Sequence, residues 1–404
     1  MTDEFLLHLP KTDLHLHLDG SIRVATLLEL AHEYHVDLPA GTESGLREKV
    51  FKDSYKDLGE YLVGFKYMTA VLQTESALSR VAYELARDNQ DEGVRYMEVR
   101  FAPQLHVHQH LSCEHVLKAV NNGLSRARDE FNAKEVVRSG AEPPFAYGIL
   151  VCALRMFPKG ASEYYDQMLE VHKHSDSKAV YALASLELAR AAVQVRDESH
   201  LPIVGFDLAG QEAGYPAVDH REAFAYAHKH FLKKTVHAGE AFGPESIFQA
   251  ITDLYADRIG HGTHLFDPDM IQDPAIEDRE GFVADLAQFI ADRRITLEIC
   301  LTSNLQTHPD LTDLSQHSYS KMAGARLSTT FCTDNRTISN TTVTGELRKA
   351  IDSLGLSSKD VKNSIIYGFK RSFYPGTYLQ KRQYVRQIIN YYHEIEQQFA
   401  VDGV

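Results

Sequence analysis

The sequence predicts an α/β protein with the architecture of a (β/α)8 TIM barrel. Eight short strand-like runs can be distinguished along the chain, and eight parallel strands is the number that closes such a barrel. Segments with helical periodicity lie between the runs, and this alternation favours a parallel sheet with crossover helices. A chain of 404 residues accommodates one barrel with insertions.

The strand-like runs follow one another in a regular order. They are TDLHLHL from Thr12, VRYMEVRFA from Val94, AYGILVCAL from Ala146, IVGFDLAG from Ile203, KTVHAGE from Lys234, RIGHGTHL from Arg258, TLEICLTSN from Thr296 and LSTTFCTDN from Leu327. Helical periodicity is clear before the second run, in residues 77–93, and before the fourth, in residues 163–196. These segments are expected to be crossover helices.

Two segments are longer than a minimal barrel needs. Residues 21–80 are predicted to form a mostly helical insertion after the first strand, and residues 132–145 a polar loop before the third. Long insertions are often lids over a binding site. Residues 342–404 are predicted to form C-terminal helices. Because no Pro-, Gly- or Ser-rich linker divides the chain, we expect a single domain over residues 1–404 with a lid-like insertion.

Composition narrows the classes of partner. The formal net charge of −14 argues against nucleic acid as a partner, since phosphate backbones are bound by concentrated Lys and Arg. No apolar run reaches the roughly 18 residues of a membrane span, and the acidic N-terminus does not resemble a secretory signal. We therefore expect a cytoplasmic protein with no membrane partner, whose four cysteines form no disulfides. The sequence does not indicate an oligomeric state.

The stretch KTDLHLHLDG, residues 11–20, places three ionisable side chains at alternate positions. In a strand, His15, His17 and Asp19 would point to one face and the intervening leucines to the other. Such histidines could be solvated on an edge strand or hydrogen-bonded in a core. They could equally bind a metal, which is one of the few partners that satisfies two imidazoles at once.

Polar residues also gather toward the carboxyl ends of most other runs. In a barrel these ends converge on one mouth, where active sites are found. The residues are His15 and His17, Asp207, His237, His261, Ser303 with Asn304, and Asp334 with Asn335. One such residue would be explained by a cap or a loop hydrogen bond, but their joint occurrence predicts a site.

Four of these residues have the ligand types of a mononuclear, zinc-like centre. His15, His17, His237 and Asp334 supply imidazoles and one carboxylate and leave a position for water. Such a metal lowers the pKa of water toward neutrality. Glu240 lies three residues after His237, where it could serve as a general acid or base. The alternative for Glu240 is a carboxylate that stabilises the start of a helix.

Six motifs identify a family resemblance. KTDLHLHLDGS, GFDLAGQE, VHAGEAFGPESI, RIGHGTHL, CLTSNLQT and TDN are spread over residues 11–340, in family order. Through them the chain resembles the adenosine deaminase family of metal-dependent amidohydrolases. The resemblance implies a barrel with one divalent metal, most plausibly Zn²⁺, and hydrolysis of adenosine and 2′-deoxyadenosine to inosine and 2′-deoxyinosine with release of ammonia.

The resemblance also implies roles for individual residues. Glu240 would protonate purine N1, and His261 would steer and help to deprotonate the metal-bound water, with Asp334 as both a ligand and a catalytic residue. Asp19 would meet the ribose, and Gly210 would offer its backbone N–H to the purine. The remaining implied substrate contacts are His17, Asn335 and the apolar residues Leu58, Tyr61, Leu62 and Phe65 of the lid. At helical spacing these last four could equally be ordinary core residues.

One position departs from the pattern. Asn335 follows the metal-binding aspartate, where well-known members have a second Asp that contacts purine N7. An amide NH₂ could donate to the N7 acceptor without an extra proton. The departure leaves the reaction intact and makes the identity of the purine base in the substrate less definite.

Several alternative functions stay open. Relatives that act on adenine tend to carry Glu in place of Asp19; others take adenosine monophosphate or 6-amino-6-deoxyfutalosine, an adenosine with an enlarged 5′ group. A two-metal hydrolase of phosphoesters or lactones would need a Lys carboxylate or Glu on the fourth strand, which GFDLAG lacks. A non-catalytic purine-binding protein would not need Glu240. Cytidine-deaminase chemistry needs a Pro-Cys-x-x-Cys motif, which is absent.

Overall fold

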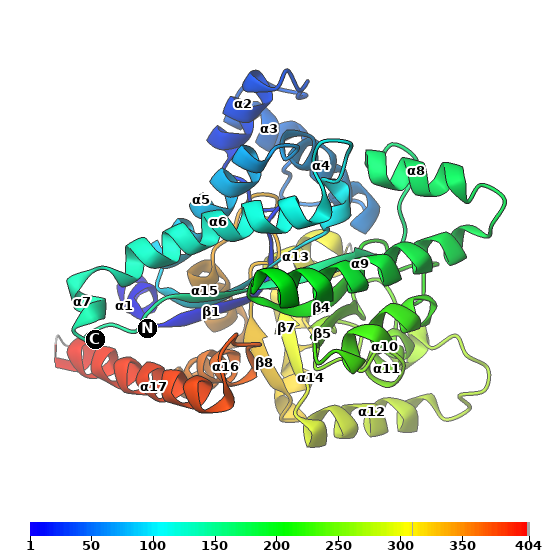
Figure 1. The fold of residues 1–404 in the computed structure, drawn as a ribbon. Coiled ribbons are helices and arrows are strands. Elements are labelled where there is room, and N and C mark those ends of the chain that lie inside the picture. Colours follow the sequence, from blue (N-terminus) through cyan, green and yellow to red (C-terminus); the bar gives the residue numbers. More distant parts are fainter. Residues whose placement is uncertain (309, 402–404) are drawn as a thin grey trace.

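All eight predicted strands are present in the computed structural model, which describes residues 1–308 and 310–401. They are β1 Lys11–His17, β2 Val94–Phe101, β3 Ala146–Leu154, β4 Ile203–Ala209, β5 Lys233–Ala238, β6 Arg258–His261, β7 Thr296–Ile299 and β8 Ser328–Phe331. The strands are parallel and pair in sequence order from β1 to β8. The predicted (β/α)8 arrangement is confirmed, with the strands surrounded by helices (Figure 1).

Between β8 and β1 the barrel is joined by a short bridge. The N–H of His17 donates to the carbonyl of Asp334 (2.8 Å), and the N–H of Asp334 donates to the carbonyl of His15 (2.8 Å). The bridge therefore links backbone atoms of three predicted metal ligands. Their relative positions are fixed by the same hydrogen bonds that nearly close the barrel.

Helices surround the strands and extend beyond them. The first eight are α1 Asp3–His8, α2 Val24–Glu33, α3 Glu43–Lys49, α4 Leu58–Val71, α5 Glu75–Asp91, α6 Cys113–Asn132, α7 Glu135–Arg138 and α8 Glu163–Val171. The others are α9 Ser177–Ser199, α10 Arg221–Lys229, α11 Pro244–Thr252, α12 Arg279–Arg293, α13 Leu301–Thr307, α14 Tyr319–Gly324, α15 Val343–Leu354, α16 Ser358–Arg371 and α17 Tyr378–Val401.

Several strands end earlier than their sequence runs suggest. The run TLEICLTSN was expected to be strand throughout, but β7 ends at Ile299 and α13 begins at Leu301. Ser303 and Asn304 therefore lie on a helix that leaves the barrel mouth, and the N–H of Asn304 donates to the carbonyl of Cys300 (2.8 Å). A short apolar run has no periodicity that separates strand from buried helix, which is why the expectation was wrong for these two residues.

The insertion after β1 consists of α2, α3 and α4, which stand at one end of the barrel (Figure 1). Asp57 caps α4 by accepting the N–H of Glu60 (2.9 Å). The predicted insertion extended to residue 80, whereas α5, which begins at Glu75, packs against β2 and α6 as a barrel helix. The loop predicted over residues 132–145 contains the short helix α7, and Asn132, the last residue of α6, exchanges two hydrogen bonds with the backbone of Phe145.

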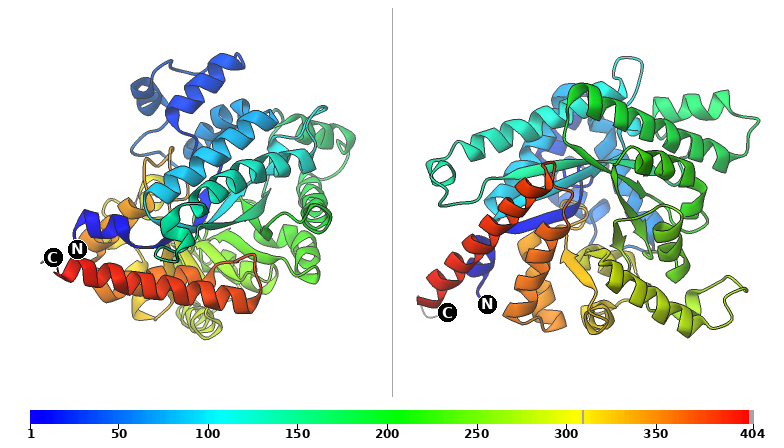
Figure 2. Two further views of the ribbon diagram at one scale, coloured as in Figure 1. Left: turned by 60° about the vertical axis from the view of Figure 1, so that its left-hand side comes forward. Right: turned by 60° about the horizontal axis from the view of Figure 1, so that its bottom comes forward.

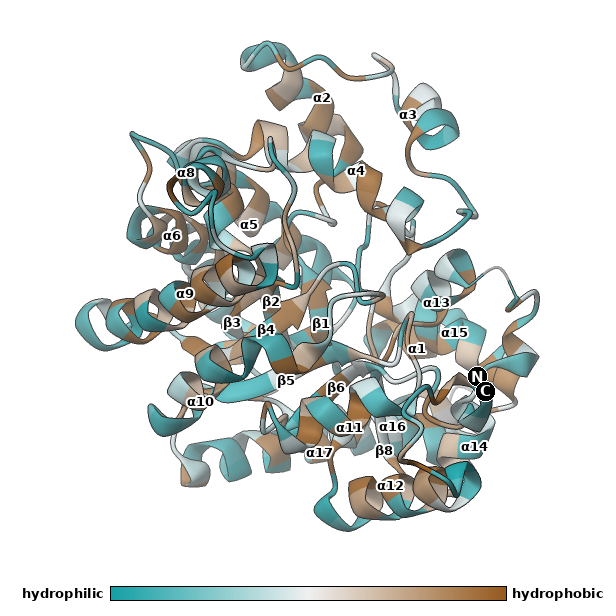
Figure 3. Ribbon diagram, turned by 90° about the vertical axis from the view of Figure 1, so that its right-hand side faces the viewer, coloured by the Kyte–Doolittle hydropathy of each residue, from teal (hydrophilic) through white to brown (hydrophobic). Residues whose placement is uncertain are grey.

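The C-terminal helices cover the side of the barrel near its bridge. Helix α16 packs on β8 and β1, and α17 packs on α16 and α1, so α1 and the last turns of α17 lie close together in both views of Figure 2. Apolar residues concentrate on the central strands and on α4 (Figure 3). Among the described residues no helix combines the length and the apolarity needed to cross a membrane.

Candidate active site

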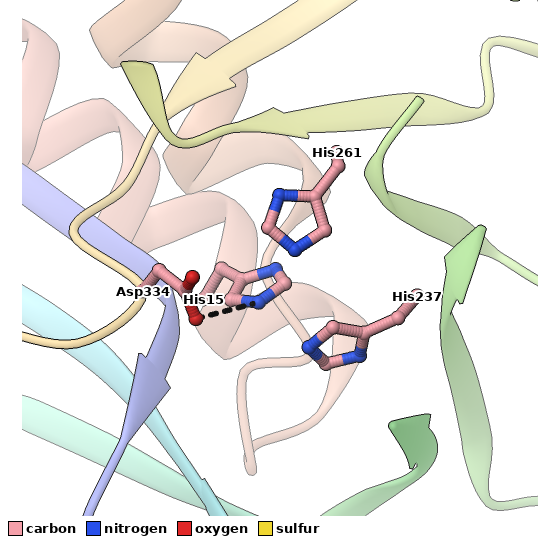
Figure 4. Close-up of side chains that lie close together, drawn as sticks. All are labelled: His15, His237, His261 and Asp334. Atoms are coloured by element: carbon pink, nitrogen blue, oxygen red, sulfur yellow. Dashed lines mark ion pairs between the residues drawn. The ribbon is translucent and has the colours of Figure 1, made fainter. Parts of the chain in front are cut away.

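Five ionisable side chains meet at the carboxyl ends of four strands. His15 and His17 come from β1, His237 from β5 and His261 from β6, and Asp334 follows β8. All five are buried. Ligand-type atoms of His15, His237, His261 and Asp334 lie within 4.8 Å of one another, and Figure 4 shows these four side chains pointing toward a common centre.

His17 belongs to the same cluster. Its Nε2 lies 3.1 Å from Nε2 of His237 and 3.4 Å from Oδ1 of Asp334. Nε2 of His15 lies 3.4 Å from the same carboxylate oxygen and has no hydrogen-bond partner among the described residues. The structure thus brings together all four residues that the sequence nominated as metal ligands, with His261 beside them.

Buried carboxylates orient two of the imidazoles by accepting hydrogen bonds from the ring nitrogens that point away from the cluster. Nδ1 of His15 lies 2.9 Å from Glu298 and Nδ1 of His237 lies 3.2 Å from Asp207, so each ring donates from Nδ1. Arg100 bridges these carboxylates at 3.1 Å from Asp207 and 2.9 Å from Glu298. Burial alone would raise the pKa of Glu298, but Arg100 and other cations hold that pKa well below its usual value. Both Nε2 lone pairs therefore face the centre.

Backbone strain accompanies this convergence. His261 and Asp334 have φ of +62° and +59°, in the left-handed region that non-glycine residues seldom adopt. Such conformations persist only where the surrounding structure enforces them, and they cluster at functional sites. Here they turn two side chains at the ends of strands into the barrel mouth.

Glu240 lies beside the cluster. Its Oε1 is 3.6 Å from Nε2 of His261, and it lines a cavity of about 360 Å³ together with Leu58, Gln211, Glu212, Thr307 and His308. Burial raises the pKa of Glu240 well above its usual value, and the negative charge of Asp334 raises it further. The carboxyl group therefore carries a proton at a pH where an exposed glutamate is ionised.

Asp19 is buried near the cluster with an unused acceptor. Oδ1 of Asp19 has no hydrogen-bond partner in the described part of the chain, and burial raises the pKa of this carboxyl to about 7. Gly210 follows β4 with φ of +94°, a conformation that glycine adopts without strain. The carboxylate of Asp19 can therefore accept a hydrogen bond from a donor group on a ligand.

The four predicted lid residues lie on or near the face of α4 that covers the site. Tyr61 is buried, and Leu58, Leu62 and Phe65 are half-buried. The ring of Phe65 is centred 6.1 Å from that of His17. The amide of Asn335 donates to the Tyr61 hydroxyl (2.8 Å), so in this structure it contacts the lid helix.

The comparison with known proteins decides the family. The sequence model described as adenosine deaminase matches residues 10–183 and 174–391. The chain belongs to the adenosine deaminase family. The adenosine deaminase of Mycobacterium tuberculosis is 36% identical over 369 residues, which cover 91% of this chain and 90% of that protein. The chain is therefore a hydrolytic deaminase, and its reaction is the deamination of a purine compound.

Solved structures share the fold across nearly the whole chain. The adenine deaminase of Arthrobacter aurescens is 21% identical with a TM-score of 0.71, covering 95% of this chain and 98% of its own. Arabidopsis ADAL in complex with IMP is 25% identical with a TM-score of 0.73, covering 97% of this chain and 99% of its own. These proteins differ in the ligands that their names state, so the fold alone does not select the purine compound.

Sequence reasoning missed the charged residues inside the barrel. Arg258 donates through Nε to Glu298 (2.6 Å) and also pairs with Glu98, and Thr235 donates to Glu298 (3.0 Å). All four side chains are buried. The available signal was charge within strand-like runs, as in VRYMEVRF and TLEIC, since buried charges must be paired.

Glu212 was also missed, although it lies within the motif GFDLAGQE. Its carboxylate accepts the backbone N–H groups of four consecutive residues, 239–242, at 2.6–3.0 Å, and the hydroxyl of Ser246. The turn that carries Glu240 is therefore anchored by one buried side chain. Such an interaction joins two loops and leaves no periodic signal in the sequence.

Proposed function

We propose that this enzyme deaminates adenosine and 2′-deoxyadenosine, giving inosine and 2′-deoxyinosine with release of ammonia. The observation that carries the choice of substrate is the buried Oδ1 of Asp19, close enough to Asp334 for the two charges to interact and without a hydrogen-bond partner among the described residues, because a ribose hydroxyl would satisfy it. Two relatives that are 35% and 36% identical to this chain are named adenosine deaminases, which supports the same substrate.

The donor set fits one divalent metal, for which zinc is the best candidate. His15, His17, His237 and Asp334 would hold it. Burial lowers the pKa of His17 well below its usual value and also lowers that of His237, so both rings are neutral and available as ligands. Nε2 of His17 and Nε2 of His237 face each other 3.1 Å apart, an arrangement that a shared cation would explain. When bound, the metal lowers the pKa of water so that a hydroxide nucleophile forms near neutral pH.

Metal content tests this assignment. His15→Ala removes one ligand, so we expect the purified variant to contain far less than the roughly one zinc per chain of the wild type. His220→Ala is the matched control, because His220 is also buried but bonds Ser185 (2.8 Å), outside the cluster. Metal analysis of the three proteins gives the result. Equal metal content in wild type and His15→Ala would contradict the ligand set.

The protein side chains divide the work of the reaction. Glu240 holds a proton and would transfer it to purine N1 as water adds to C6, which removes the aromaticity of the ring and makes C6 tetrahedral. The carboxylate left on Glu240 would take the proton that the water loses and pass it to the amino nitrogen, so that breaking the C6–N bond releases ammonia. The proton of the C6 hydroxyl would then return to Glu240, leaving a carbonyl oxygen on C6. The side chains of α4 exclude solvent water from the cavity, and Glu212 holds Glu240 in place.

Asp19 would discriminate among purine compounds. As an acceptor near the ribose, its carboxylate would gain a charge-assisted hydrogen bond from a hydroxyl. A 5′-phosphate would bring further negative charge, which costs roughly 4 kcal/mol at 4 Å and an effective dielectric of about 20. Free adenine would leave the carboxylate without its donor. We therefore expect adenosine and 2′-deoxyadenosine to be much better substrates than adenine and adenosine monophosphate.

Specificity constants for five compounds test the proposal. Adenosine, 2′-deoxyadenosine, adenine, adenosine monophosphate and aminodeoxyfutalosine are assayed by ultraviolet absorbance at pH 8, where a carboxyl group with a pKa of about 7 is mostly ionised. Asp19→Asn should reduce the preference for adenosine over the monophosphate. A wild-type preference for adenine or the monophosphate would contradict the proposal, whereas a preference for aminodeoxyfutalosine would preserve the mechanism with a different substrate.

A further inference from the structure

We infer that Asn304 and His317 are positioning residues that keep the proton of His261 on Nε2, directed into the active site. A continuous series of hydrogen bonds runs from the backbone of Tyr319 through these two side chains to His261. Each bond determines which atom donates in the next one. The inference rests on the proposed function only for its effect on turnover, since the position of the proton follows from the hydrogen bonds.

The series begins at a donor whose direction is fixed. The backbone N–H of Tyr319 lies 3.0 Å from Nδ1 of His317, and because an amide N–H only donates, Nδ1 must accept. His317 is buried, and burial lowers its pKa to about 4, so the ring is neutral. A neutral imidazole that accepts at Nδ1 carries its proton on Nε2.

The next bond orients the amide of Asn304. Nε2 of His317 donates to Oδ1 of Asn304 (3.2 Å), which places the NH₂ group on the other side, 3.1 Å from Nδ1 of His261. The amide donates there, so Nδ1 of His261 accepts. A ring nitrogen that accepts carries no proton of its own, so His261 carries its proton on Nε2.

This placement has two consequences at the site. Nε2 of His261 has no partner among the residues described and lies 3.6 Å from Oε1 of Glu240, so it offers an N–H donor to an oxygen of the reacting water. A protonated Nε2 has no lone pair, and it can neither bind a metal nor accept a proton. His17 rather than His261 is then the third imidazole ligand, and His261 acts as a donor instead of the base that the family resemblance implies.

Neither positioning residue is part of the ligand cluster. Asn304 is on α13 and His317 lies between α13 and α14, and both are buried. Only the last member of the series, His261, faces Glu240. Changes at Asn304 or His317 should therefore lower kcat while leaving KM nearly unchanged.

The decisive variant is Asn304→Asp, which keeps the shape of the side chain but makes both of its oxygens acceptors. A carboxylate there would draw a proton onto Nδ1 of His261. We expect two-bond ¹H–¹⁵N spectra of zinc-loaded, histidine-labelled enzyme to show an Nε2–H tautomer for His261 in the wild type and a proton on Nδ1 in Asn304→Asp. His261→Gln identifies the signal among the 21 histidines.

Kinetic measurements accompany the spectra. We expect Asn304→Asp to lower kcat by roughly tenfold to 10²-fold with KM changed less than about twofold, since a directed donor at the reacting oxygen is lost. Asn132→Asp is the control, because Asn132 also bonds a backbone N–H and carbonyl but is the last residue of α6 and does not belong to this series of hydrogen bonds. His317→Leu should lower kcat, whereas His317→Gln, which can accept from Tyr319 and donate to Asn304, should restore it.

The tautomer of His261 is measured in the absence of substrate. If the enzyme acts on a different purine compound, the proposed function is wrong but this inference still holds. An Nδ1–H tautomer of His261 in the wild type would overturn the inference. If Asn304→Asp fails to fold, the His317 pair decides, and equal kcat for His317→Leu and His317→Gln would also overturn it.

Discussion

Glu240→Gln is expected to lower kcat by a factor of roughly 10² or more, because the amide cannot deliver the proton that the carboxyl group holds. The fold and the zinc content should stay unchanged, since Glu240 is outside the predicted ligand set and the substitution preserves its shape. The pKa of Glu240 is raised well above its usual value by burial and by Asp334, so the carboxyl group keeps its proton at a pH where an exposed glutamate is ionised. Wild-type turnover should fall as the pH rises through that pKa.

Steady-state kinetics, metal analysis and circular dichroism of the variant measure these expectations. Glu245→Gln is the matched control: Glu245 lies on α11, five residues after Glu240, and its carboxylate accepts the N–H groups of Gln272 and Asp273 without lining the cavity. That control should retain near-normal turnover. Near-normal turnover in Glu240→Gln as well would assign the proton transfer to another residue.

The positions of the predicted ligands and of His261 followed from strand ends. His15, His237 and His261 lie at or near the carboxyl ends of strand-like runs, and parallel strands deliver these ends to one mouth. Period-two alternation placed His15 and His17 on one face of β1, and the structure brings both to Asp334. Local pattern and barrel geometry were sufficient for this part of the site.

Other parts depend on contacts between distant segments. Glu212 recognises the N–H groups of residues 239–242 only because two loops meet, and Asn304 reaches His261 only because β7 ends early and α13 begins. The contact of Asn335 with Tyr61 likewise requires α4 to lie over the site. No periodicity in the sequence indicates contacts between such distant segments, so these contacts could not be predicted from it.

The charged barrel interior leads to the second large effect, which concerns stability. Arg100→Met should lower the free energy of unfolding by about 3–5 kcal/mol, because removing one partner leaves buried carboxylates without compensation. Arg100 donates to Asp207, to Glu298 and to the carbonyl of Leu14 (2.7 Å), and all three charged side chains are fully buried. Methionine fills similar space without a charge, so packing changes little.

Urea unfolding in the presence of a chelator measures this effect without a contribution from metal binding. Arg47→Met is the matched control, since Arg47 pairs with Glu43 one turn away on α3, where the two side chains are 34% and 57% exposed, and such surface pairs contribute less than about 1 kcal/mol. The two variants lose the same type of ion pair and differ chiefly in burial. Equal losses of stability would mean that Asp207 and Glu298 are not held as buried anions by Arg100. A loss of stability in Arg100→Met alone would instead indicate that the orientation of His15 and His237 depends on this arginine. Glu298 and Asp207, which accept hydrogen bonds from Nδ1 of these two histidines, are the carboxylates that Arg100 neutralises.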